Sequence, residues 1–515
     1  MPDTAQHSAA TNGVGPALPA HVDIAIVGSG FSGLGMAIKL KDAGREDFVV
    51  LERAEDVGGT WQANTYPGCQ CDVPSNLYSF SFAPNPDWSQ TFALQPEIWA
   101  YLRRVADEYG IRPHVRLRCE VLGAEWDEGA GRWRIETSRG ALTARVLVAG
   151  TGGLSEPALP DIPGMETFAG PAFHTARWEH DAELAGKRVA VIGTGASAVQ
   201  VIPRIQPLVG QLSVFQRTPP WIMPHPGRSV RPRERLLFRM LPWLQRAVRG
   251  AVYWGRETYV LPFKFHRLSR LPERIARAHL EKQVADPRLR AELTPDYEIG
   301  CKRILMSNEY FPALQQPNVE LVTSGIRELR PHAILTTDGT EHPVDAIVYG
   351  TGFRVSDMPV GERLRGAGGC LLGDVWREQG LSALRGTTMA GFPNLFMLVG
   401  PNTGLGHNSI VFMIESQLAY VMDALRAMDA HGATVLDTRP GAQAAFNDEL
   451  QAAMRGTVWT EGGCASWYLD ARGRNTTLWP GTSWSFRRAT RRFDLAEHVL
   501  RAETAEPRET AAVVC

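Results

Sequence analysis

The chain has 515 residues and a mass of 56.7 kDa, with 44% hydrophobic and 21% charged residues. This length exceeds what one hydrophobic core usually holds, so we expect two or more domains and exclude a disordered or fibrous protein. The formal charge of -1 and the pI near 6.9 give no overall field that would attract nucleic acid. We therefore expect a packed enzyme with small-molecule partners and no nucleic-acid partner.

The seven cysteines are scattered and form no dense disulfide framework, so a reducing cytoplasm is the expected location. Cys69 and Cys71 have no second ligand pair nearby, so we predict packing residues and no metal site. The first residues lack the pattern of a signal peptide, and no apolar run reaches the roughly 18 residues of a membrane span. We predict disordered tails at 1–19 and 501–515.

The strongest local pattern begins at Val22, where the apolar run VDIAIV leads into Gly28-Ser29-Gly30-Phe31-Ser32-Gly33. This GxGxxG follows a predicted strand and opens a helix expected over 31–43, which is the setting in which the turn binds a pyrophosphate. Glu52 ends the next strand, 24 residues after Gly28, and suits an unphosphorylated ribose. The alternative is a glycine-rich structural turn.

A second unit of the same kind begins at Lys187, where KRVAVI leads into Gly193-Thr194-Gly195-Ala196-Ser197-Ala198. The position 24 residues after Gly193 is Arg217 rather than an acid. A guanidinium suits a ribose 2′-phosphate, so the second site is predicted to bind NADPH rather than NADH. The alternative is a solvated arginine at a strand end.

Two further strand-and-glycine segments, ARVLVAGTGG near Gly150 and VDAIVYGTGF near Gly350, each suit the closing strand of one unit. The predicted fold is α/β, with two Rossmann-like dinucleotide-binding domains, the second inserted in the first. The first domain is expected at 20–153 and 344–500, and the second at 154–343 with a helical insertion at about 222–298.

Between the two units, Phe168, Gly170, His174 and Trp178 match the pattern FxGxxxHxxxW. With the segments Gly58–Phe82, GCKR at Gly300–Arg303 and Gly391–Ser409, the chain resembles the class B flavin monooxygenases, and within them the Baeyer–Villiger monooxygenases. Glu179 departs from the Pro or Asp that usually follows Trp178. The resemblance gives His174 a structural or hinge role rather than a catalytic one.

The resemblance implies FAD at the first unit and NADPH at the second, with Asp72 and Arg303 as the active-site pair. The residues expected around FAD are Gly28, Gly30, Phe31, Ser32, Gly33, Glu52, Arg53, Gly59, Thr60, Trp61, Asp72, Val73, Tyr78 and Pro401. Those expected around NADPH are Gly193, Thr194, Gly195, Ala196, Ser197, Gln200, Arg217, Thr218, Lys302 and Arg303.

The implied reaction inserts one oxygen atom of O2 next to a ketone carbonyl through a C4a-peroxyflavin, giving an ester or lactone, with sulfoxidation as a side activity. Attack on the ketone produces an alkoxide, and Arg303 is suited to donate to that oxygen while Asp72 holds the guanidinium. The alternative for this pair is an ordinary structural ion pair. By the same resemblance, NADP⁺ stays bound during turnover.

Three other functions compete with this reading. An N- or S-oxygenating flavin monooxygenase would not need Arg303 for an alkoxide. A disulfide reductase usually has a redox-active CxxC, which this chain lacks. A non-catalytic nucleotide-binding module would consume no oxygen in response to a substrate.

The segment 228–290 has 16 Lys or Arg residues against 5 Asp or Glu, and mixes arginine with Leu, Trp, Phe and Tyr at helical spacing. A peripheral membrane helix has this composition, but so does a solvated helical subdomain, which we favour from the sequence. The aromatic stretch 461–486 is equally suited to lining a substrate pocket and to core packing.

Overall fold

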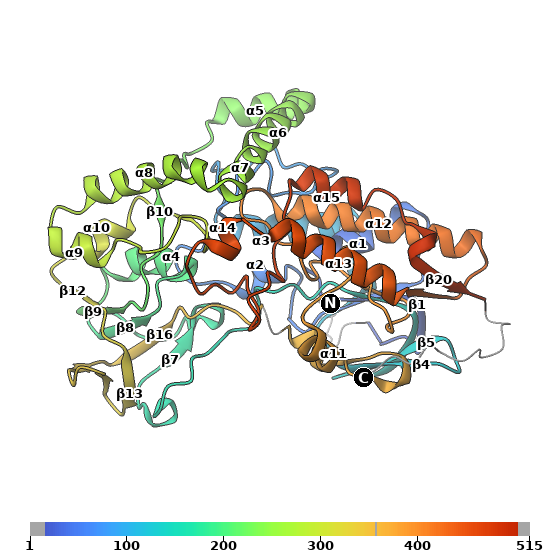
Figure 1. Cartoon of the computed structure of the whole chain (residues 1–515), viewed down its shortest axis with the longest axis horizontal. Coiled ribbons are helices and arrows are strands. Elements are labelled where there is room, and N and C mark those ends of the chain that lie inside the picture. The colour runs from blue at the N-terminus through green and yellow to red at the C-terminus, as the bar shows by residue number, and fades with distance from the viewer. Residues whose placement is uncertain (1–15, 356–357, 503–515) are drawn as a thin grey trace, which may run out of the picture.

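Two separate β-sheets organise the part of the chain that the computed structural model describes, residues 16–355 and 358–502 (Figure 1). The first sheet lies with the C-terminal helices at one end of the molecule, and the second sheet lies at the other end. A group of helices runs along the upper edge of the view above both parts. The fold is therefore α/β, as expected.

The first sheet has the order β17-β4-β5-β6-β1-β2-β3, and β18 pairs in parallel with the carboxyl end of β6. Its centre is parallel, because β1 pairs both β2 and β6 in parallel. The strands are β1 (His21–Val27), β2 (Phe48–Leu51), β3 (Val115–Arg116), β4 (Val121–Asp127), β5 (Arg132–Thr137), β6 (Gly140–Ala149), β17 (Leu364–Arg365) and β18 (Leu395–Met397).

The helix after β1, α1 (Phe31–Asp42), agrees with the predicted helix to within one residue, with Ala43 as its C-cap. Gly44 then takes a positive φ of 73°, the left-handed conformation that ends helices. On its other side α1 packs closely against α12 (Ile410–Ala430), since a Cβ added at Gly35 would lie 2.7 Å from a methyl of Leu418. These two helices cover one face of the first sheet.

The second sheet is entirely parallel, in the order β12-β9-β8-β16-β7. Its strands are β7 (Ala172–His174), β8 (Arg188–Ile192), β9 (Gln211–Phe215), β12 (Val319–Val322) and β16 (Ala346–Tyr349). The predicted return to the first domain at 344 is wrong, because β16 pairs β8 and β7 rather than any strand of the first sheet. The chain rejoins the first sheet only at β17.

The predicted disordered tails lie mostly outside the described residues. Where they overlap them, two details differ from the prediction. The carbonyls of Pro16 and Ala17 accept hydrogen bonds from Arg139 and Arg116, so the N-terminal tail is anchored before residue 20. At the other end, Arg501 still belongs to β20 (His498–Arg501), which pairs β19 (Val435–Thr438).

The helical insertion lies in the chain between β10 (Ile222–Met223) and β11 (Leu305–Met306), two short strands that pair in parallel. Its helices are α5 (Pro232–Met240), α6 (Pro242–Glu257), α7 (Val260–Lys264), α8 (His266–Gln283) and α9 (Pro287–Glu292). In Figure 1, α5 and α6 project from the top of the molecule, and α8 lies above the second sheet. None of the helices within the described residues is both long enough and apolar enough to cross a bilayer.

The remaining elements complete the two halves. The helices are α2 (Thr60–Ala63), α3 (Gln95–Glu108), α4 (Ala196–Ile205), α10 (Tyr310–Leu314), α11 (Leu372–Gln379), α13 (Pro440–Met454), α14 (Val458–Glu461) and α15 (Ser483–Ala489). A small antiparallel sheet joins β13 (Ile326–Arg330), β14 (Ala333–Thr336) and β15 (Glu341–Pro343). Short 3-10 turns occupy Arg112–His114, Met165–Thr167, Thr175–Arg177, Pro359–Glu362, Ala367–Gly369 and Leu495–Glu497.

Candidate functional site

The first glycine turn lies where β1 passes into α1. A Cβ added at Gly33 would lie 1.8 Å from the carbonyl oxygen of Gly28, so only glycine permits this contact between helix and strand. Gly30 is the N-cap of α1, and no side chain caps that end. The first N–H groups of the helix are therefore free of a side-chain acceptor, as a pyrophosphate site requires.

Glu52 follows β2 and reaches back to this turn. Its carboxylate accepts hydrogen bonds from the Ser29 N–H at 2.8 Å, the Ser29 hydroxyl at 2.6 Å and the Ala54 N–H at 2.9 Å. These bonds hold a buried acid beside the glycine turn, in the place where a ribose hydroxyl donor would meet it.

The segment around α2 closes over the same turn. Gly59 takes a positive φ of 54°, and a Cβ there would lie 2.9 Å from the Cα of Gly30. Behind it, the indole N–H of Trp61 donates to the hydroxyl of Tyr78 at 3.1 Å, and the Tyr78 ring makes an edge contact with Phe31 at 5.2 Å. Two backbones that approach without side chains leave room for a flat or phosphate-bearing ligand, so this cradle fits FAD.

The other residues expected at FAD lie around this turn in different ways. Thr60 begins α2, Val73 is buried beside Asp72, and Arg53 forms an ion pair with Glu156. Pro401 follows β18, whose parallel pairing with β6 brings the chain to the carboxyl edge of the first sheet. The free thiols of Cys69 and Cys71 are buried near this segment, and burial raises the pKa of Cys69 to about 12, which suits packing residues.

The second glycine turn repeats this geometry between β8 and α4. Gly193 has a φ of 105°, and a Cβ there would lie 2.5 Å from the carbonyl oxygen of Gly350. Gly195 is the N-cap of α4, again without a side-chain cap, so Ala196 and Ser197 open a helix whose first N–H groups face the turn. The hydroxyl of Thr194 donates to the carbonyl of Thr218 at 3.2 Å, which holds the turn next to the segment after β9.

Two cations meet at the end of β9. Burial lowers the pKa of the Lys302 amine, and the positive charge of Arg217 lowers it further. The Lys302 amine also lies 4.9 Å from the ring centre of Tyr297. Two like charges in one place are unfavourable on their own, and a dianionic phosphate between them would offset that cost. This arrangement fits the 2′-phosphate of NADPH.

Gln200, which is expected near NADPH, lies on α4 and makes hydrogen bonds to the first domain. Its amide nitrogen donates to the carbonyl of Gln70 at 3.0 Å, and its amide oxygen accepts from the hydroxyl of Tyr66 at 2.8 Å. Gln70 and Tyr66 belong to the first domain, so this side chain joins the two domains.

Arg303 and Asp72 lie in contact, as predicted. The Arg303 Nε–H donates to Asp72 at 2.7 Å, and a terminal nitrogen lies 2.5 Å from the same oxygen. Burial would raise the pKa of Asp72, but the charge of Arg303 and its hydrogen bond outweigh burial and hold that pKa below its usual value. The charge of Asp72 likewise raises the pKa of Arg303 above its usual value. The pair is therefore permanently ionised, with remaining guanidinium donors for another oxygen.

Two further residues at this pair were not predicted from the sequence. Tyr468 is buried, its pKa is raised to about 12 by burial, and it interacts electrostatically with Arg303. Arg256 of α6 is a second cation that lowers the pKa of Asp72, and its Nε–H donates to the carbonyl of His407 at 2.9 Å. The aromatic stretch 461–486 thus contributes to this site through Tyr468, while Phe486 is core.

A disulfide between Cys301 and Cys464 connects the segment that carries Arg303 to the one that carries Tyr468. The sequence separation is 163 residues, and neither cysteine has a sequence neighbour that marks it as half of a pair. A backbone hydrogen bond from Glu298 to Gly462 joins the same two segments at 3.0 Å. Both connections hold the segment of Arg303 against the segment of Tyr468.

His174 lies at the edge of the second sheet, at the end of β7, and is buried. Its Nδ1 accepts a hydrogen bond from the Ala176 N–H at 3.0 Å, so the neutral ring carries its proton on Nε2. Burial lowers the pKa of His174 to about 4.

The other residues of this pattern make packing contacts. A Cβ at Gly170 would lie 2.2 Å from the Asp345 carbonyl, and Trp178 packs on Phe173 with 5.1 Å between the ring centres. Phe168 packs against the core on the outer side of the second sheet.

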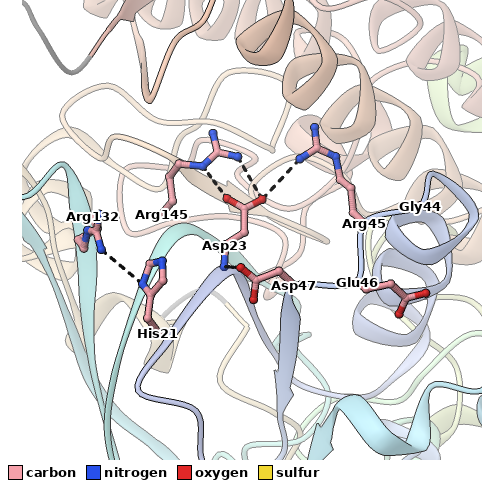
Figure 2. Close-up of a pocket in the computed structure, with 8 residues that line it drawn as sticks. All are labelled: His21, Asp23, Gly44, Arg45, Glu46, Asp47, Arg132 and Arg145. Atoms are coloured by element: carbon pink, nitrogen blue, oxygen red, sulfur yellow. Dashed lines mark hydrogen bonds and ion pairs between the residues drawn. The ribbon is translucent and has the colours of Figure 1, made fainter.

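A depression of about 460 Å³ lies at the opposite end of β1 from the glycine turn (Figure 2). Three arginines and three carboxylates line it, and Asp23 pairs with Arg145 at 2.6 Å and with Arg45 at 3.5 Å. It is unrelated to the nucleotide turns, and we assign it no function.

Comparison with known proteins shows the family of the chain. A family model described as pyridine nucleotide-disulphide oxidoreductase matches residues 25–241. A protein of Streptomyces coelicolor named Baeyer-Villiger monooxygenase is 55% identical over 489 residues, covering 94% of this chain and 94% of that protein. The chain belongs to the Baeyer–Villiger monooxygenase family. The resemblance inferred from the sequence is thereby confirmed.

Solved structures agree with both the fold and the cofactors of this enzyme. A closed crystal structure of cyclohexanone monooxygenase has a TM-score of 0.84 at 27% identity, covering 94% of this chain and all of that one. A structure of OTEMO in complex with FAD and NADP also has a TM-score of 0.84, at 29% identity, with 93% and 99% coverage. The enzyme is an NADPH-dependent flavoprotein monooxygenase with FAD and NADPH as cofactors, as the two glycine turns predict.

Proposed function

We propose that the enzyme converts a ketone into an ester or lactone, and that it oxidises sulfides as a side activity. One oxygen atom of O2 enters the product next to the carbonyl carbon, the other leaves as water, and NADPH supplies the two electrons. Bound FAD supplies the activated oxygen. The observation that carries the proposal is the ionised Arg303–Asp72 pair beside the buried Tyr468.

Within this proposal, the two cofactors occupy the two glycine turns. FAD lies on Gly28–Gly33 with Glu52 at its ribose, and NADPH lies on Gly193–Ser197 with its 2′-phosphate between Arg217 and Lys302. Arg303 therefore stands between the two cofactor sites, next to Lys302 in the chain and bonded to Asp72 of the first domain.

The role of each active-site residue follows from charge. As oxygen adds to the ketone, the carbonyl oxygen gains negative charge, and a fixed guanidinium donor stabilises that charge. Asp72 accepts the Nε–H of Arg303, which orients the remaining N–H groups of the guanidinium. Tyr468 and Cys301 of the disulfide are buried beside this pair.

The proposal is tested by incubating the purified enzyme aerobically with NADPH and a panel of ketones, and identifying the products by mass spectrometry. We expect esters or lactones from the native enzyme and little or none from Arg303→Ala, which should still bind FAD. Arg303→Lys keeps a charge without the planar donors and should recover only part of the rate. Full ester production by Arg303→Ala would overturn the assigned role.

The same panel separates the proposal from an N- or S-oxygenating monooxygenase. Such an enzyme would form amine oxides or sulfoxides and leave every ketone unchanged. It would also be insensitive to Arg303→Ala, because it forms no alkoxide.

A further inference from the structure

The helical insertion contains most of the exposed large apolar side chains. Within the described residues, 19 such side chains are exposed, and 11 of them lie between Leu236 and Ile275. They are Leu236, Leu237, Met240, Trp243, Trp254, Tyr259, Leu261, Phe265, Leu268, Leu271 and Ile275, which together we call the apolar face. Single exposed apolar residues are ordinary, but this concentration in one segment indicates an interaction surface for a protein or a membrane.

Helix α6 carries a stripe of apolar residues that is exposed to solvent. Trp243, Ala247, Ala251 and Trp254 recur at helical spacing and are exposed. These residues form one stripe of the helix, and that stripe faces away from the protein.

The opposite side of α6 faces the protein, where polar groups lie beside the buried Tyr253, which stacks on Phe412 at 4.8 Å. The amide of Gln245 donates to the carbonyl of Asn85 at 2.6 Å, and the guanidinium of Arg249 donates to the carbonyl of Asn76 at 2.7 Å. Two turns further on, Arg256 and the buried Glu257 bond to the segment around His407 and Asn408. Because the polar side chains are held inside, the outward apolar stripe is a fixed feature of the fold.

The neighbouring helices continue the same face. On α8, Leu268, Leu271 and Ile275 are exposed at helical spacing, and Leu261 and Phe265 stand one turn apart on and after α7. Beyond the insertion, the exposed Trp484 of α15 lies 6.0 Å from the ring of Trp254. In Figure 1, α5, α6, α7 and α8 lie along the upper side of the molecule, with α15 beside them.

Arginines accompany the apolar face. The segment 228–290 has an excess of 11 positive charges, and its exposed arginines include Arg231, Arg233, Arg246, Arg270 and Arg274. A second copy of this chain would bring the same excess of positive charge against it, so the charge opposes self-association. A bilayer with anionic headgroups offers both an apolar interior for the tryptophans and negative charge for the arginines.

We propose that the apolar face docks on the surface of an anionic lipid bilayer, with α5 and α6 inserted at the headgroup level. The composition of 228–290 alone favoured a solvated subdomain, and the outward direction of the apolar stripes reverses that preference. The proposal concerns a surface apart from the cofactor sites and does not depend on the substrate.

The test is co-sedimentation of the FAD-loaded enzyme with vesicles. We expect binding to vesicles of phosphatidylcholine with phosphatidylglycerol, weaker binding at high salt, and little binding to phosphatidylcholine alone. Trp243→Ser with Trp254→Ser should lower the partition coefficient at least about tenfold, and Arg233→Gln with Arg246→Gln about fivefold for each charge removed. Vesicles with brominated acyl chains should quench tryptophan emission in the native enzyme and not in the double tryptophan variant.

Leu159→Ser with Leu208→Ser is the matched control, because both side chains are as exposed as Trp243 but lie outside the insertion. The control pair should bind vesicles like the native enzyme, and every variant should keep its flavin absorbance. Equal binding to neutral and anionic vesicles, or no binding to either, would overturn the proposal. So would light scattering that shows a dimer in the native enzyme and a monomer in the double tryptophan variant.

Discussion

The Nε–H of Arg303 donates to Asp72 at 2.7 Å, across 231 positions of sequence. Asp72 belongs to the segment that covers the first glycine turn, whereas Arg303 follows the helical insertion of the second domain. This ion pair therefore joins the two cofactor-binding domains at the point where chemistry is proposed.

Asp72→Asn should leave Arg303 charged but less firmly oriented, because a neutral amide accepts a hydrogen bond without the ionic attraction. We expect product formation to fall about tenfold to a hundredfold, as small misplacements of catalytic groups do. The check is single-turnover product formation in enzyme reduced with NADPH. An unchanged rate with normal flavin content would show that Arg303 does not need Asp72.

Arg217→Ala should weaken the binding of NADPH and leave the binding of NADH nearly unchanged. A charge-assisted contact to a 2′-phosphate contributes about 1.5–3 kcal/mol, so the KM for NADPH should rise at least about tenfold. The ratio of the two KM values is the measurement. The same variant should raise the pKa of Lys302, since it removes a neighbouring positive charge. An unchanged KM ratio would refute the 2′-phosphate assignment.

His174 should make the stability of the enzyme depend on pH. Its pKa is about 4 in the folded protein against 6.5 in the unfolded chain, so folding favours the neutral ring. This contribution is complete above pH 6.5 and is lost as the pH falls toward 4, with a total of about 3 kcal/mol at most. The melting temperature of the native enzyme should therefore drop toward that of His174→Asn as the pH is lowered. His431→Asn, at an exposed histidine, is the control; a constant difference between native and His174→Asn would contradict the prediction.

Opening the Cys301–Cys464 disulfide should loosen the segment of Arg303. A crosslink that closes a loop of this length stabilises a protein by about 2–4 kcal/mol, so Cys464→Ser or a reducing agent should lower the melting temperature. Turnover should fall more than FAD content, because the bond lies beside Arg303 rather than beside the flavin turn. Peptide mass spectrometry without reduction reports the bond directly, and free thiols at both positions would remove the basis of this prediction.

Gly33→Ala should abolish FAD binding or prevent folding. Its added methyl would lie 1.8 Å from the carbonyl oxygen and 2.9 Å from the carbonyl carbon of Gly28, and these backbone atoms cannot move aside as a flexible side chain could. Gly441→Ala in α13 is the matched control, because no atom lies within 4 Å of its added methyl. Flavin absorbance per mole of protein distinguishes the two variants. A yellow Gly33→Ala protein with native absorbance would contradict the prediction.

The features predicted well from the sequence are local ones. Each glycine turn, with Glu52 or Arg217 at the same offset, is set by about 25 consecutive residues, and the structure shows both turns as expected. The pair of Asp72 and Arg303 is distant in sequence and came only from the family resemblance. No local pattern in the chain brings those two residues together.

Other features depend on packing that the sequence pattern does not specify. Strands near Gly150 and Gly350 have the same apolar run and glycine turn, so the pattern alone could not show that β16 belongs to the second sheet. The outward direction of Trp243 and Trp254 depends on where Gln245 and Arg249 find partners. Tyr468 and the disulfide of Cys301 were missed because their partners lie more than a hundred residues away.

The position of β16 bears on the order in which the enzyme forms during synthesis. All five strands of the second sheet are present once Tyr349 has left the ribosome, whereas the first sheet still lacks β17 and β18. Domains generally fold as units as the chain emerges, yet here the domain that begins first is completed last. A nascent chain arrested just after β16 would therefore hold a complete sheet for the nicotinamide cofactor and an incomplete one for the flavin.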